Sequence, residues 1–101
     1  MSESPSSEPA AEEILEQIKQ LKVSDVLLSS LTAIAQLGYA KLEPASRDLA
    51  QARLAIESLK ALVPLLEGSV PEQTIKDFNS MVANLQLAYA SAAKEDTAGG
   101  G

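Results

Sequence analysis

The segment 26–40, VLLSSLTAIAQLGYA, constrains the fold most, because it places apolar side chains on almost every side of a helix. At 100° per residue, one apolar face consists of Leu27, Leu31, Ile34, Ala35, Gly38 and Leu42. A second apolar face consists of Val26, Ala33, Leu37 and Ala40. A helix with two such faces is predicted to be covered from two directions.

This central helix is predicted to begin at the capping residues Ser24 and Asp25 and to end near Leu42, because Pro44 follows. Gly38 lies inside it, where glycine costs about 0.5–1 kcal/mol relative to alanine. Two explanations for Gly38 are open. Either it admits another helix at close range, or the helix frays there.

A short amphipathic helix is predicted ahead of the central one, over residues 11–21. Glu12 and Glu13 suit the positive end of its dipole. Its apolar stripe consists of Ile14, Leu15, Ile18 and Leu21.

Two further helices are predicted after Pro44. One begins near Ser46 and ends at Gly68, a residue that favours a left-handed helix end. Its apolar residues alternate steps of three and four: Leu49, Ala52, Ile56, Leu59, Val63 and Leu66. The last helix begins at the capping box Ser69 to Glu72 and repeats this step to about Ala93.

The predicted fold is therefore all-α, a small antiparallel bundle of three core helices plus a short N-terminal amphipathic helix. Residues 11–94 are expected to form a single helical domain. Residues 1–10 are expected to be a disordered acidic arm, because Ser, Pro and Glu bury too little surface to offset the entropy of ordering them. Residues 95–101 are expected to be a disordered tail.

The charge distribution argues against a nucleic-acid partner. The formal net charge is −6, but residues 14–94 hold eight acidic and eight basic side chains and are neutral. A neutral domain disfavours binding to a phosphate backbone, and only a local basic patch is left as an alternative. No nucleic acid is expected as a partner from bulk charge.

The residue types also argue against catalysis. The chain has no Cys and no His, so disulfides, thiolate nucleophiles, Cys or His zinc sites and histidine proton transfer are excluded. Ser29 and Ser30 have no neighbouring base in the sequence, and the helical acids Glu57, Glu67 and Asp77 fall at polar positions on separate segments. We expect no enzyme activity, catalytic residue, cofactor or metal.

The expected location is the cytoplasm, without membrane association. Glu3 and Glu8 occur in a first segment that has no basic or apolar stretch of a secretory signal. No unbroken run of 18 apolar residues occurs, and Asp25 and Gln36 interrupt the most apolar segment. An interfacial helix usually carries Lys or Arg along its polar face, which this segment lacks.

A longer pattern extends over about residues 23–93. It consists of Ser30, Leu31, Leu37, Gly38, Asp48, Leu49, Ala52, Ile56, Leu59, Leu62, Gly68, Val70, Leu85 and Tyr89. This pattern resembles the bacterial family known as domain of unknown function 1844. The chain departs from the family in the short connection YAKLEPASR, and in Gln86 and Ala88, where many members have Arg. The resemblance implies a small helical protein without an assigned activity, and a ribosome-linked partner, since some members are encoded beside a translation initiation factor.

The predicted interface consists of apolar residues outside the main seams: Val26, Ala33, Leu37, Leu54 and Leu65. Burying a large apolar side chain is worth about 1.5–3 kcal/mol, so we expect these residues to be covered. The cover is predicted to be the helix over 11–21 of the same chain, the same surface of a second copy, or both.

The expected function is protein–protein interaction, through a homodimer or other homo-oligomer and through an unidentified protein partner in a larger assembly such as the translation machinery. Two alternatives stay open. One is a small-molecule-binding protein with a cavity between helices, and the other is a non-catalytic accessory subunit of an enzyme.

Overall fold

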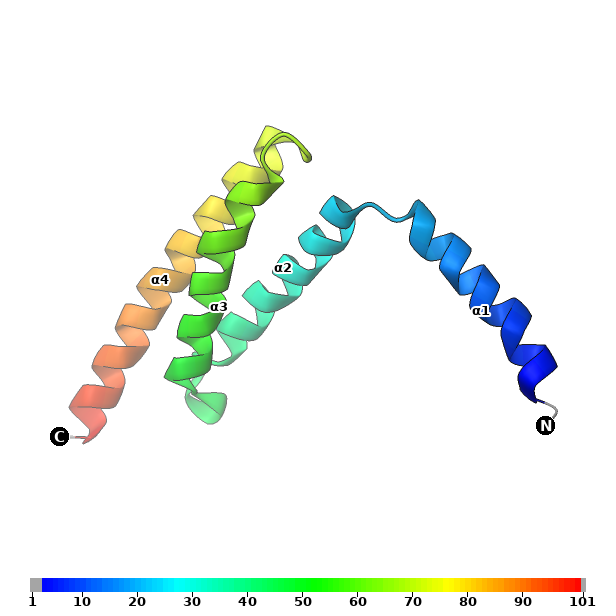
Figure 1. The fold of residues 1–101 in the computed structure, drawn as a ribbon. Helices are drawn as coiled ribbons and strands as arrows, with labels where there is room; N and C mark the ends of the chain where they lie inside the picture. Colours follow the sequence, from blue (N-terminus) through cyan, green and yellow to red (C-terminus); the bar gives the residue numbers. More distant parts are fainter. Residues whose placement is uncertain (1–2, 101) are drawn as a thin grey trace.

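The computed structural model describes residues 3–100, and the side chains of residues 11–97, as a chain of helices (Figure 1). Four α-helices follow one another: α1 (Glu3–Gln20), α2 (Val23–Ala40), α3 (Leu49–Leu62) and α4 (Glu72–Gly100). The short 3₁₀ helix η1 (Pro44–Ser46) precedes α3, and η2 (Val63–Leu66) follows it. No β-strand lies between residues 3 and 100, which confirms the all-α prediction.

The helices α2, α3 and α4 form the predicted antiparallel bundle. In Figure 1, α3 and α4 lie side by side, whereas α2 crosses α3 near the connection between them and diverges toward its own N-terminus. Helix α1 points away from the other three. The radius of gyration is 19.0 Å, against about 13 Å for a compact domain of 100 residues. A single chain is therefore extended, and only its three-helix part has a core.

The core is built from the predicted seams. Its fully buried large side chains come from α2, α3, η2 and α4: Leu31, Leu59, Val63, Leu66 and Leu85. Ile34, Leu49 and Tyr89 are partly buried against the same cluster. Spacing of three and four residues thus identified the inward side of each helix, because that spacing keeps side chains on one stripe.

At Gly38, helix α2 packs closely against α3. A Cβ atom placed on Gly38 would lie 3.0 Å from the Cβ atom of Ala55 and 3.5 Å from Cδ2 of Leu85. Gly38 is buried and helix α2 continues beyond it to Ala40. Close approach, rather than fraying, explains this glycine.

Helix α3 is shorter than predicted at both ends. The carboxylate Oδ1 of Asp48 accepts a hydrogen bond from the backbone N–H of Gln51 at 3.2 Å, so Asp48 is the N-cap and the helix begins at Leu49 instead of near Ser46. Pro64 has no backbone N–H to donate, and the last turn is the 3₁₀ helix η2. Gly68 then adopts φ = 86°, as the predicted left-handed turn requires.

The two outer helices extend beyond their predicted bounds. Helix α1 begins at Glu3 and α4 ends at Gly100, so both include residues of the predicted arm and tail; residues 1, 2 and 101 lie outside the described chain. Arg47 contacts the added turn of α4. Its Nη1 donates to Oδ1 of Asp96 at 2.9 Å, and its Nη2 donates to Oε1 of Glu95 at 3.2 Å.

Candidate functional site

The five residues predicted for self-association are all exposed on α2, α3 and η2. Val26 is 48% exposed, Leu37 57%, Leu54 58% and Leu65 68%, and Ala33 is exposed as well. Large apolar side chains of this kind are usually buried in folded domains. The single chain thus covers only one of the two apolar faces of α2.

Two of these residues lie close together where α2 packs against α3. Gly38 lies beside Ala55, and the backbone N–H of Asp48 donates to the carbonyl of Lys41 at 2.8 Å. Leu37 and Leu54 consequently line one groove between the helices.

The exposed stripes on the two helical segments have the same order of side chains. Each stripe is a large apolar residue, a serine, an alanine and a leucine, separated by four, three and four positions. These eight residues form what we call the α2–α3 face: Val26, Ser30, Ala33 and Leu37 on α2, with Leu54, Ser58, Ala61 and Leu65 on α3 and η2. All are exposed except Ser58, which is half-buried.

The α2–α3 face contains no charged side chain. Asp25, in the first turn of α2, is the one charged residue of that helix. On α3 the charged residues lie off the stripe, and Lys60 Nζ is 3.7 Å from Oε2 of Glu57. Any partner of this face therefore meets apolar and small hydroxyl groups.

The groove within this face is small. It has a volume of about 190 Å³ and is lined by Ile34, Leu37, Gln51, Leu54, Ala55 and Ser58. Binding sites for drug-sized molecules usually have about 300–1,000 Å³. The groove is better suited to one or two protruding side chains than to a free ligand.

Helix α1 carries the second exposed apolar surface. Its stripe residues Ile14, Leu15, Ile18 and Leu21 are 54–58% exposed. Helix α1 points away from the bundle, so its stripe does not cover the α2–α3 face of its own chain (Figure 1). Of the two predicted covers for that face, the intrachain one is absent from residues 3–100.

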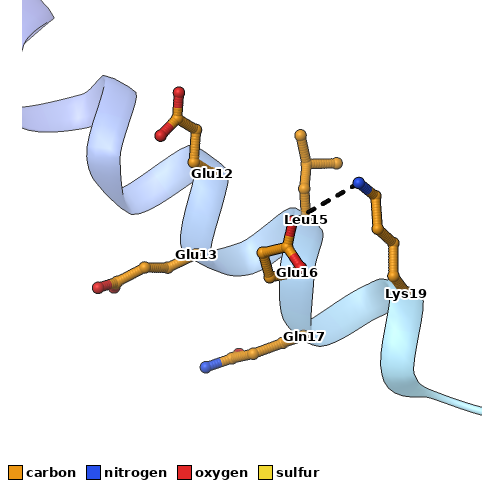
Figure 2. A pocket seen from close by; sticks show the side chains of 6 residues that line it. All are labelled: Glu12, Glu13, Leu15, Glu16, Gln17 and Lys19. Carbon is orange, nitrogen blue, oxygen red and sulfur yellow. Dashed lines mark ion pairs between the residues drawn. The ribbon is translucent and has the colours of Figure 1, made fainter.

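The other side of α1 is polar, as Figure 2 shows. A hollow there is bordered only by α1 side chains: Glu12, Glu13, Leu15, Glu16, Gln17 and Lys19. Lys19 Nζ lies 3.6 Å from Oε2 of Glu16. Because a single helix supplies every side chain, nothing encloses a ligand at this place.

The most connected polar side chain is Arg47, between η1 and α3. Its Nη2 and Nε donate to the carbonyl of Leu42 at 2.8 and 3.1 Å, and its Nη1 donates to the carbonyl of Ala92 at 3.3 Å. The hydrogen bond to Asp96 raises the pKa of Arg47, partial burial opposes that shift, and Glu95 adds to it. No local sequence pattern marks Arg47, because its partners lie far along the chain.

Acidic side chains do not gather into a metal site in the described part of the chain. No group of three or more Asp or Glu residues there is placed to hold a cation. No polar or charged side chain is buried in the described core either.

Helix α2 is long and apolar enough to cross a bilayer by length and composition alone. It has 18 residues and a mean hydropathy of 1.2, and 17% of its residues are buried. The core helix of a protein in water passes the same test of length and composition, although such a helix is mostly buried.

No family model, curated protein or solved structure matches this chain. The resemblance to domain of unknown function 1844 thus stays a prediction from the residues that carry it.

Proposed function

We propose that this protein acts through protein–protein contacts, as a non-catalytic helical protein that associates with itself. The observation that supports this function most is the α2–α3 face. Its residues carry no charge and, apart from the half-buried Ser58, are exposed in the single chain. Exposed apolar patches of this kind mark interaction surfaces.

The energetics decide how much surface the association needs. The four large side chains of the face are 48–68% exposed, so covering each is worth about 1 kcal/mol, or about 8 kcal/mol for two copies. Association of two proteins costs about 4–15 kcal/mol. The face alone is therefore marginal. Burial of the half-exposed Ile14, Leu15, Ile18 and Leu21 on both copies adds about 8 kcal/mol more, which brings the total to about the upper end of the association cost.

The proposed setting is the cytoplasm, without nucleic acid or membrane. Leu31, Ala35 and Gly38 of α2 are buried in the bundle, which supports a helix that packs against α3 and α4 rather than against lipid. Asp25 in the first turn of α2 supports the same view, because a carboxylate in the hydrocarbon core is costly. An unidentified protein in a larger assembly, such as the translation machinery, fits the same surfaces.

The test is a double substitution in the face, Leu37→Glu with Leu54→Glu. Sedimentation velocity over a concentration series should give an oligomer for the natural sequence and a monomer for the variant. Charges placed on the apolar face lose solvation when they are covered, whereas they stay hydrated in the monomer. Circular dichroism should show that helix content is kept, since both side chains are more than half exposed.

The matched control is Leu87→Glu on α4, a side chain that is 71% exposed and lies outside the face. This variant should keep the oligomer of the natural sequence. A natural sequence that is monomeric at every concentration overturns the proposed function. An unchanged oligomer in the double variant shows that another surface makes the contact.

A further inference from the structure

Residues 23–30 form the first two turns of α2, and none of them is buried. Val23 is 82% exposed, Val26 is exposed as well, and Leu27 and Leu28 are only half-buried. Figure 1 shows the reason, since α2 diverges from α3 toward its own N-terminus. The N-terminal half of α2 therefore carries apolar side chains without a neighbouring helix to cover them.

Helix α1 has an apolar surface of matching length. Ala11 lies three positions before Ile14 and therefore on the same side of the helix as the α1 stripe. From Ala11 to Leu21 this side extends over about 15 Å, at 1.5 Å per residue. The segment 23–33 of α2 has the same length. Because the opposite side of α1 is charged, as Figure 2 shows, a docked α1 buries its stripe and leaves its charged groups in water.

The connection between the two helices is short enough for a hairpin. Only Leu21 and Lys22 separate α1 from α2, and Lys22 is extended, with φ = −97° and ψ = 139°. Two antiparallel helices are commonly joined by two to five residues. A change in the backbone dihedrals of these two residues is therefore enough to lay α1 along α2.

In such a hairpin, residues at about the same distance from the connection lie opposite one another. Ile18 then lies beside Val26, and Ala11 lies beside Ala33, four residues that are all exposed in the open chain. A contact within one chain avoids the loss of translational and rotational freedom that association of two chains requires. The two-residue connection also keeps α1 at a high effective concentration near α2. The chain's own α1 is thus favoured over a second molecule as the cover of this half of α2.

We propose that α1 is a strap that folds back on residues 23–33 of its own chain, and that the protein associates with itself only while this strap is open. The structure has the strap in its open position (Figure 1). This inference rests on the proposed self-association and adds its regulation.

Closure of the strap competes with association for the same side chains. The α1 stripe supplies about half of the apolar surface that two copies can bury, and closure covers this stripe together with Val26 and Ala33. A closed chain has fewer large side chains left for a partner: Leu37, Leu54 and Leu65. Since the complete face alone is already marginal, a closed chain should stay monomeric.

The chain has no cysteine, which allows a direct test of closure. Ala11→Cys is combined with Ala33→Cys in the full chain, which is then treated with a mild oxidant. A disulfide forms only when the two Cα atoms approach within about 7 Å. We expect a disulfide within one chain, formed at a rate that does not depend on protein concentration.

The matched control is Glu12→Cys with Ala33→Cys. Glu12 is next to Ala11 in the sequence but lies on the charged side of α1, so closure points it away from α2. The Ala11 pair should couple at least tenfold faster than the Glu12 pair. Equal rates for the two pairs overturn the inference. Covalent dimers in place of the disulfide within one chain also overturn it, because they place α1 on a second copy.

The closed chain then tests the competition. The Ala11→Cys, Ala33→Cys variant is compared in sedimentation equilibrium before and after oxidation, with the reduced protein as its own control. Oxidation should raise the dissociation constant for self-association at least tenfold. If the oxidised chain associates as tightly as the reduced one, self-association stands and its control by α1 is refuted. A natural sequence that is monomeric at every concentration removes the proposed function and the competition together, whereas the disulfide still decides whether α1 closes.

Discussion

Gly38→Ala tests the close contact between α2 and α3 on which the bundle is built. The new Cβ atom would be 3.0 Å from Cβ of Ala55 and 3.5 Å from Cδ2 of Leu85. The Cβ atom of Ala55 is fixed to its backbone and cannot rotate away, so relief requires a shift of one helix. Leu85 is fully buried and has little room to move.

Two opposing effects set the size of the change. Alanine in place of a helical glycine stabilises by about 0.5–1 kcal/mol. Added volume in a packed core destabilises by about 1–3 kcal/mol. We therefore expect Gly38→Ala to lower the free energy of unfolding by about 1 kcal/mol. On an exposed helix surface the same substitution is stabilising.

The matched control is Ala55→Gly, alone and combined with Gly38→Ala. Alone it should cost about 2 kcal/mol, from helix propensity and a lost buried methyl group. In the double variant the clash is absent, so the free energy of unfolding should exceed the additive value by about 1–2 kcal/mol. Urea unfolding followed by circular dichroism measures all four proteins. One fixed concentration is used, because the proposed self-association would add to the free energy of unfolding. The close contact between Gly38 and Ala55 would be refuted if the Gly38→Ala variant is as stable as the natural sequence and the two substitutions have additive effects in the double variant.

Three other substitutions test the ends and connections of the helices. Arg47→Gln removes the hydrogen bond to Asp96 and should speed amide hydrogen exchange at the end of α4, whereas Lys94→Gln should not. Equal exchange rates in both variants would show that Arg47 does not hold the end of α4 in place. Gly68→Ala should lower the free energy of unfolding by about 1 kcal/mol in urea, because φ is 86° at this position. A Cβ there meets no other atom within 4 Å, so the backbone conformation alone causes the loss. An unchanged urea midpoint would contradict the left-handed turn. Asp48→Ala should cost about 1 kcal/mol in the same assay, and Asp48→Asn should restore most of it if the side chain acts as an N-cap.

The inward side of each core helix could be predicted from the sequence. Ala52, Ile56 and Leu59 were assigned to the core by their spacing and are buried. The same spacing places Leu37 and Leu54 outside the main apolar stripes of their helices, and both are exposed in the single chain. Spacing is reliable here because the angle of 100° per residue is a property of the backbone and does not depend on the partner helix.

Helix ends and long-range polar contacts were harder to predict. Ser24 and Asp25 were expected to cap α2, yet Lys22 is its N-cap residue and makes no side-chain capping bond. Helix ends depend on which of several adjacent residues adopts the extended conformation, and packing decides between them. Arg47 illustrates the second difficulty, because its carboxylate partners lie 48 and 49 residues away and no local pattern marks such a pair.

The groove between α2 and α3 could not be predicted from either helix alone. Gly38 packs beside Ala55, and this contact brings Leu37 and Leu54 to the same groove. Relations between two helices are not properties of either segment, so the spacing of apolar residues could predict the extra apolar surface but not which of its residues lie together.

The core and the α2–α3 face occupy opposite sides of the same helix, which links folding to association. Leu31 and Ala35 are buried against α3 and α4, while Val26 and Ala33 are exposed. A domain with a core of this size has a free energy of unfolding of only a few kcal/mol. Each residue of the face that a partner covers would add to the stability of α2, which also carries core residues. Substitutions in the face should therefore change the apparent stability of the proposed oligomer by mass action. Substitutions in the core, such as Gly38→Ala, change the stability of the monomer itself, and the concentration dependence of unfolding separates the two.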